Sequence, residues 1–119
     1  MALSDYTPPW APILAEVDEE RVRQNAKWGE QNHPDGTGPD WRWVAIFRQP
    51  FAQCAEIAKL QVDYDAKRGQ STYMGILAEE FFEALAEDDP ANLRAELVQV
   101  AAVAVAWIEA IDRRDGAAC

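Results

Sequence analysis

The chain has 119 residues, which is enough for one domain with one modest hydrophobic core. Hydrophobic residues make up 49% of it and indicate a globular protein, despite a formal net charge of −10. That charge repels nucleic-acid phosphates and anionic lipid surfaces, so we expect no nucleic-acid partner and no membrane partner. We predict a single domain over residues 1–119, in which residues 1–10 form an extended N-terminal arm.

The cysteines and the apolar segments exclude other classes of protein. Cys54 and Cys119 are the only cysteines, which indicates neither a disulfide framework nor a cysteine metal site. The first ten residues have no basic region and no long apolar core, unlike a signal peptide. The longest nearly apolar run, 97–108, is too short to span a bilayer as a helix. We therefore expect a cytoplasmic protein.

The first predicted helix covers residues 13–28, and Gly29 is a suitable stop for it. The loop 31–40 follows, whose prolines and glycines exclude regular structure. Such a loop is either mobile or able to close over a ligand. The aromatic segment 41–48 leaves helix and extended chain both open.

Two more helices are predicted in the middle of the chain. The second helix has Pro50 in its first turn and ends at Gly69. The third helix starts at Ser71 or Thr72, either of which can cap it, and it runs to about Asp88. Its apolar stripe consists of Met74, Leu77, Phe81 and Leu85.

The fourth predicted helix starts at Asp89 and Pro90, with the carboxylate as cap and the proline in the first helical position. It runs to about residue 114, and Gly116 ends it. Residues 97–108 are apolar around nearly the whole helix, which requires burial on all sides. Without any strand-like alternation, the sequence predicts an all-α fold of four helices that assembles into a dimer or larger oligomer.

The third and fourth helices carry acidic side chains on faces that can meet. At about 100° per residue, Glu80 and Glu83 share one flank of the third helix, while Glu96 shares a face with apolar residues of the fourth. An antiparallel hairpin would bring these carboxylates together, where their repulsion is costly without a cation. Because all the candidate ligands are oxygens, the pattern predicts Mg²⁺, with Mn²⁺ as the alternative, rather than zinc.

Glutamates on helices are usually solvated, so an acidic surface without a metal ion is the competing interpretation. Glu96 favours a metal site because it leads directly into the apolar run, where a solvated glutamate would be out of place.

Two acidic motifs resemble those of a known family. The run Glu79-Glu80-Phe81-Phe82-Glu83 and the later run Glu96-Leu97-Val98-Gln99 resemble the EExxE and ExxD motifs of MazG-like all-α nucleoside triphosphate pyrophosphohydrolases. Residues 23–36 also resemble the opening segment of actinobacterial and phage members. The resemblance covers most of residues 19–114 and implies a dimeric or tetrameric helical bundle.

The resemblance also implies an activity, the magnesium-dependent cleavage of a nucleoside triphosphate to the monophosphate and pyrophosphate. By motif position, Glu80, Glu83 and Glu96 would be metal ligands in the catalytic centre. Glu79 would bind a further ion or orient the attacking water. Gln99 stands where the family has Asp; its amide oxygen can bind magnesium but supplies no charge and cannot act as a base.

Substrate contacts are predicted outside the acidic motifs. The candidates for phosphate contact are Lys27, Lys67, Arg68 and Arg94, for each of which a solvated surface role is the alternative. Lys27 is preferred because it lies in the family-like opening segment. Trp28 and His33, with Trp41 as a further candidate, could line a pocket for the base by stacking and hydrogen bonding.

Two other functions stay open at this level. A nucleotide sensor could keep the metal site and lose turnover through Gln99, and a structural assembly domain would use its glutamates only as a solvated face. A di-iron carboxylate bundle is disfavoured, because it needs Glu-x-x-His pairs and the sole histidine, His33, lies in a loop.

Overall fold

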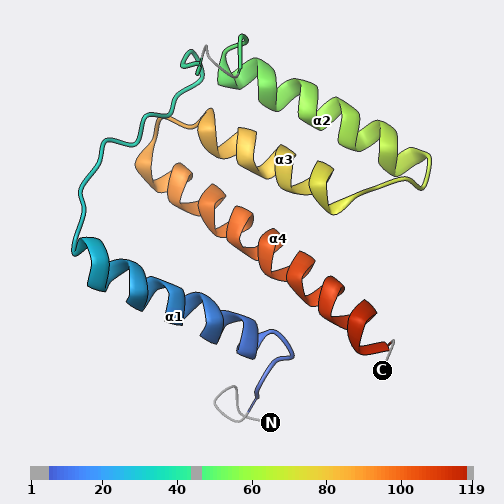
Figure 1. Ribbon diagram of the computed structural model, residues 1–119. Coiled ribbons are helices and arrows are strands. Elements are labelled where there is room, and N and C mark those ends of the chain that lie inside the picture. The colour runs from blue at the N-terminus through green and yellow to red at the C-terminus, as the bar shows by residue number, and fades with distance from the viewer. Residues whose placement is uncertain (1–5, 44–46, 118–119) are drawn as a thin grey trace. The chain divides into compact units, whose positions relative to one another are not determined.

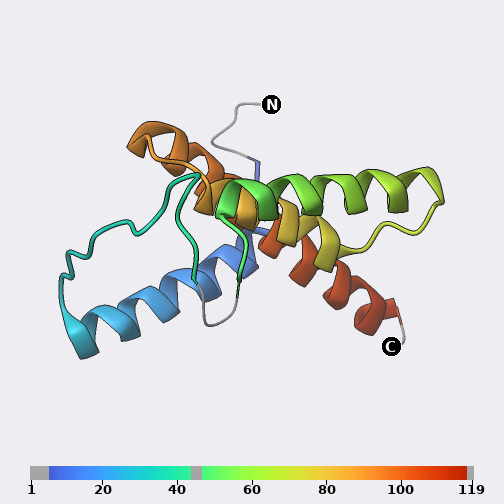
Figure 2. The same ribbon diagram turned by 90° about the horizontal axis from the view of Figure 1, so that it is seen from above.

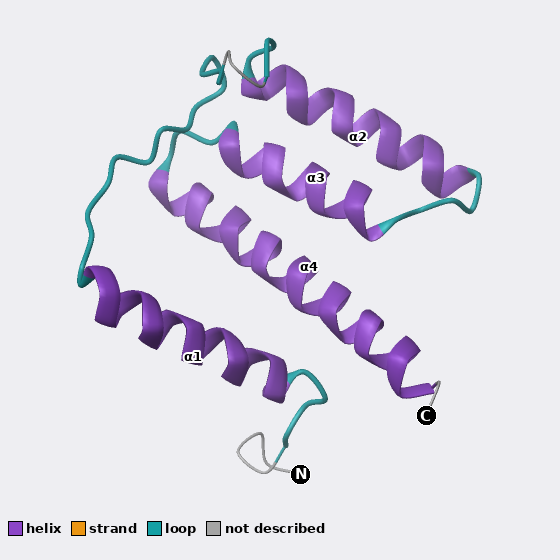
Figure 3. Ribbon diagram, in the orientation of Figure 1, coloured by secondary structure: helices purple, strands orange, loops and turns teal. Residues whose placement is uncertain are grey.

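The computed structural model describes residues 6–43 and 47–117, and within them it contains four α-helices and no strand (Figures 1 and 3). The helices are α1 (Ala11–Trp28), α2 (Phe51–Lys67), α3 (Tyr73–Leu85) and α4 (Pro90–Ala117). The all-α prediction is therefore confirmed. Of the expected N-terminal arm, residues 1–5 lie outside the described part, and residues 6–10 contain no helix.

The chain divides into two compact units. One consists of residues 1–34 and 105–119, and the other of residues 35–104. The first unit contains α1 and the end of α4, and the second contains α2, α3 and the beginning of α4.

In the unit 35–104, α2 and α3 lie side by side and run in opposite directions (Figures 1 and 2). Gly75 is located in this interface, where an added Cβ would lie 3.6 Å from Cγ2 of Val62. That distance is an ordinary van der Waals contact, so Val62 of α2 lies beside this turn of α3. Among the described residues of this unit, the buried hydrophobic side chains are Phe51, Cys54, Ala84 and Leu93.

Backbone hydrogen bonds attach the segment before α2 to the neighbouring helices. The Gly38 N–H donates to the Leu85 carbonyl (2.9 Å), and the Phe51 N–H donates to the Trp41 carbonyl (2.8 Å). Gly38 has φ 141, and a Cβ there would lie only 2.7 Å from Cδ1 of Trp41, so this turn requires glycine. Part of the predicted loop 31–40 is thus fixed to the end of α3; of the segment 41–48, residues 44–46 lie outside the described chain.

The helix ends agree with the sequence at two starts and differ at two stops. Thr72 caps α3 by accepting from the Gly75 N–H (3.0 Å), and Asp89 accepts from the Asn92 N–H (3.0 Å) at the start of α4. However, α3 ends at Leu85 rather than near residue 88, and α4 continues through Gly116 to Ala117. Gly116 therefore does not stop the helix.

Several apolar residues expected in the core are exposed in the single chain. Met74 and Phe81 are 64% and 41% exposed, because α2 packs against the side of α3 that carries Gly75, about 100° to 120° away around the helix. Leu97 and Val98 on α4 are 51% and 53% exposed. The beginning of the apolar run is therefore not buried on all sides within one chain.

In the other unit, Ile13 is buried and Gly29 ends α1. Gly29 has φ 66, and its N–H donates to the Asn25 carbonyl (2.8 Å). This stop was predicted and is confirmed. Across the described residues, none of the helices combines the length and the hydropathy that crossing a membrane requires.

Candidate functional site

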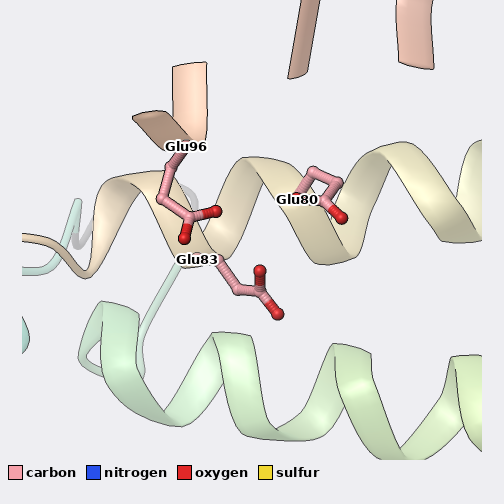
Figure 4. A group of neighbouring side chains, drawn as sticks. All are labelled: Glu80, Glu83 and Glu96. Carbon is pink, nitrogen blue, oxygen red and sulfur yellow. The ribbon is translucent and has the colours of Figure 1, made fainter. Parts of the chain in front are cut away.

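Three carboxylates from two helices meet in the unit 35–104. Glu80 and Glu83 lie on α3 and Glu96 lies on α4, and an oxygen from each comes within 4.8 Å of the others (Figure 4). All three side chains are partly buried. The structure thus brings together the three residues that the sequence predicted as metal ligands.

Local structure explains the convergence. Glu80 and Glu83 are three residues apart in α3, so they project from one flank about 60° apart. The turn after Leu85 reverses the chain, and the cap formed by Asp89 fixes the start of α4. Buried Leu93 anchors the first turns of α4, and Glu96, one turn later, reaches the same place.

The charges in this cluster oppose one another. Partial burial raises the pKa of Glu80, and the negative charges of Glu96 and Glu79 raise it further. Burial also raises the pKa of Glu83, with additional contributions from Glu80, Glu96 and Glu79. Without a cation, the folded protein therefore resists full ionisation of this group.

Lys59 on α2 is a functional candidate that the sequence analysis missed. Its positive charge acts on Glu83 and lowers the pKa of that carboxyl, against the larger effects of burial and the neighbouring glutamates. Periodicity alone could not select it, because the sequence does not show which flank of α2 faces the acidic residues. In the structure α2 packs along α3, and Lys59 lies near enough for its charge to act on Glu83.

The separation of the oxygens suits a small hard cation after minor adjustment. Magnesium holds its ligands at about 2.1 Å, so two of them are at most about 4.2 Å apart. A closure from 4.8 Å requires only side-chain rotation in glutamates that remain partly exposed. Three carboxylates also leave coordination positions for water or phosphate oxygens, which is the way magnesium usually binds in proteins.

The other residues predicted for this centre take different positions. Glu79 precedes Glu80 on α3, is partly buried, and exerts its charge on both Glu80 and Glu83. Gln99 is exposed on α4, about one turn after Glu96. Arg94 is exposed as well, and Arg68 donates to Oη of Tyr64 (2.7 Å).

The remaining predicted substrate residues belong to the unit that contains α1. Trp28 and His33 line one hollow there, as expected for a shared pocket. The Lys27 Nζ lies 4.7 Å from the centroid of the Trp28 ring, in a cation–π contact rather than in solvent alone. Trp41 belongs to the unit 35–104, where it lines a separate apolar pocket with Phe81 and other aromatic residues.

Fold and site together define an all-α protein with a cluster of three carboxylates, Glu80, Glu83 and Glu96, that could hold a divalent cation. Comparison with protein-family models, curated proteins and solved structures gave no match.

Magnesium is expected to raise the thermal stability of the wild-type protein, because the ion removes repulsion that exists only in the folded state. At a free concentration of about 100 times Kd, the gain in free energy of unfolding is about 2.7 kcal/mol. Glu83→Gln and Glu96→Gln should lower metal affinity at least roughly 10- to 100-fold, the range found for residues that merely support metal ligands. Calorimetric titration and melting curves measure both effects.

Glu87→Gln is the matched control for this prediction. Glu87 lies beyond the end of α3 and outside the cluster, so its replacement should leave magnesium binding unchanged. Equal losses of magnesium affinity in the Glu83 and Glu87 variants would show that binding depends only on the overall negative charge of the protein.

Removal of metal should also produce a distinctive pH dependence. Because the folded-state pKa values of Glu80 and Glu83 are raised, the folded protein binds more protons than the unfolded chain at pH values above 4.5. The free energy of unfolding contributed by these groups therefore increases as the pH falls from neutral towards 4.5. Urea denaturation in EDTA at several pH values measures this slope.

The double variant Glu80→Gln/Glu83→Gln is the comparison for the pH experiment. It should be more stable than the wild type at neutral pH in EDTA, and its stability should depend less on pH over the same range. An identical pH profile in the two proteins would contradict the proposed repulsion.

Proposed function

We propose that this protein is a magnesium-dependent nucleoside triphosphate pyrophosphohydrolase of the MazG-like all-α type. The observation that carries the proposal is the approach of Glu80, Glu83 and Glu96 to within 4.8 Å, from two separate sequence motifs. Other features agree with it, since oxygen ligands favour magnesium and an acidic chain needs a metal ion to bind phosphates.

Each residue of the cluster has a role in the proposed reaction. Glu80, Glu83 and Glu96 would hold the ion, with Mn²⁺ as an alternative to Mg²⁺. When bound, the metal would neutralise the triphosphate oxygens and lower the pKa of a water molecule. Glu79 would orient the attacking water or bind a further ion, and its position beside the cluster is compatible with both roles. The positive charge of Lys59 would add to the field that stabilises charge on the phosphates.

A nucleotide sensor of the same fold is the second candidate function. The observation that favours it is Gln99, a neutral and exposed side chain at the position where the resembling family has an aspartate. A sensor would bind nucleotide and magnesium without releasing pyrophosphate.

The proposed assembly is a homodimer or homotetramer. The supporting observation is the number of large apolar side chains that one chain leaves exposed in the unit 35–104. They include Ile57, Leu60, Tyr64, Met74, Phe81, Leu97 and Val98. Their exposure on α2, α3 and α4 provides the apolar surface that a second copy would bury.

Incubation with a panel of nucleoside triphosphates and magnesium should release pyrophosphate and the monophosphate in equal amounts. Glu83→Gln should reduce the rate by roughly 100-fold or more, because it removes a metal ligand from the reacting centre. Glu87→Gln should retain the wild-type rate, and circular dichroism should show unchanged helix content in both variants.

The products distinguish the candidate functions. Release of inorganic phosphate with a diphosphate product would exclude the proposed cleavage. Nucleotide binding without any product would favour the sensor. If Glu83→Gln turned over at the wild-type rate, the acidic cluster would not be the active centre.

Light scattering should give a mass of at least two chains of 13.3 kDa. Leu60→Glu combined with Met74→Glu should lower that mass, because it places charges on the exposed apolar faces of α2 and α3. Lys67→Glu, at an exposed charged position near the end of α2, is the control and should leave the mass unchanged. A monomeric wild type would contradict the assembly.

A further inference from the structure

The end of α1 and the segment after it form a hollow of about 580 Å³, large enough for a nucleoside. At about 100° per residue, its lining residues Arg21, Gln24, Asn25 and Trp28 project from one side of α1. Gly29, with φ 66, then turns the chain so that Glu30 and His33 also line the hollow. The sequence analysis identified only Trp28 and His33 of this set.

Arg21 is held in place by its neighbours. Its Nη1 donates to Oε1 of Gln24 (2.6 Å), and Nε2 of Gln24 donates to Oε1 of Glu20 (3.5 Å). Among the described residues, the edge formed by Nε and Nη2 of Arg21 makes no hydrogen bond. That edge presents two parallel N–H donors, the arrangement that binds a pair of adjacent acceptors.

Glu30 provides hydrogen-bond acceptors in the same hollow. Its Oε2 accepts from Nδ2 of Asn32 (3.2 Å), so the carboxylate retains acceptor positions for a ligand. A carboxylate also disfavours a phosphate group in this place, because both would be negatively charged. The hollow therefore combines a paired donor, a paired acceptor and an indole ring.

Trp28 provides the surface for an aromatic ligand. Trp28 is 55% exposed, and Lys27 lies over its ring with Nζ 4.7 Å from the centroid. The ammonium group covers one face of the indole, and a base would stack on the other face. Base–aromatic stacking is favourable for any base, so the neighbouring polar groups must provide selectivity.

We propose that this hollow binds a guanine base, stacked on Trp28, with Arg21 donating to O6 and N7 and Glu30 accepting from N1–H and the 2-amino group. Of the four common bases, only guanine presents paired acceptors on one edge and paired donors on another. The inference goes beyond the proposed function, since binding of a guanine base in this hollow requires neither the acidic cluster nor cleavage of a phosphate.

Guanosine, which has no phosphate, tests the hollow without magnesium. NMR titration should shift the indole N–H signal of Trp28, which can be assigned among the five tryptophans by comparison with Trp28→Phe. Adenosine, cytidine and uridine should bind more weakly. Arg21→Lys keeps the charge but loses the paired donors, and it should weaken guanosine binding by roughly 5- to 150-fold, the value of one paired contact to a base.

Glu30→Gln should also weaken guanosine binding, whereas Arg113→Lys is the matched control. Arg113 pairs with Glu109 (3.3 Å) and does not line the hollow, so its variant should bind as the wild type does. Equal responses to all four nucleosides, or an unaffected Arg21→Lys variant, would overturn the guanine assignment. No change at Trp28 with any nucleoside would overturn the hollow as a base site.

The outcome separates this inference from the proposed function. Glu83→Gln should bind guanosine normally while it fails to release pyrophosphate. Pyrophosphate release without guanosine binding would reject only the base site. Guanosine binding by a protein that releases no pyrophosphate from any nucleotide would reject the proposed hydrolysis and leave the base site standing.

Discussion

The repulsion among Glu80, Glu83 and Glu96 is the constraint on which the proposed chemistry depends. Three carboxylates lie within 4.8 Å in a partly buried place, and burial together with mutual repulsion raises the pKa of Glu80 and Glu83. Among the described residues, Lys59 is the one group whose charge lowers the pKa of Glu83. The cluster thus destabilises the folded chain, and a divalent cation would remove this destabilisation. Ion binding and the free energy of unfolding are therefore linked.

Two helices, α3 and α4, are enough to bring the three carboxylates together. One flank of α3 supplies two carboxylates, and the reversal before α4 supplies the third. α3 ends at Leu85, so Glu87 follows the helix, and it is not part of the cluster. The packing of α2 along α3 brings Lys59 near enough for its charge to act on Glu83. Backbone packing, rather than a larger number of acidic residues, determines which carboxylates meet.

Sequence periodicity predicted the elements and the acidic trio, since helical spacing and the caps at Thr72 and Asp89 are local properties. The helix stops were harder to predict. Gly116 is tolerated inside α4, and α3 ends at Leu85, before the polar residues that the sequence prediction included in it. Lys59 and Arg21 were missed for different reasons. The role of Lys59 requires the rotation of one helix against another, whereas Arg21 shares a helix face with Trp28 and could have been found from spacing alone.

The net charge of −10 explains why nucleotide recognition would be divided between two kinds of contact. An acidic protein does not attract a triphosphate from a distance. At physiological ionic strength, the attraction between a phosphate and a single Lys or Arg side chain is screened over about 8 Å. A triphosphate that arrives with its magnesium carries less negative charge and gains ligands from the carboxylates. The base carries no net charge, so it can be recognised by stacking and paired hydrogen bonds that the acidic surroundings do not weaken. Selectivity for a base would then come from Trp28, Arg21 and Glu30, whereas the acidic cluster consists of three carboxylates, which do not distinguish one base from another.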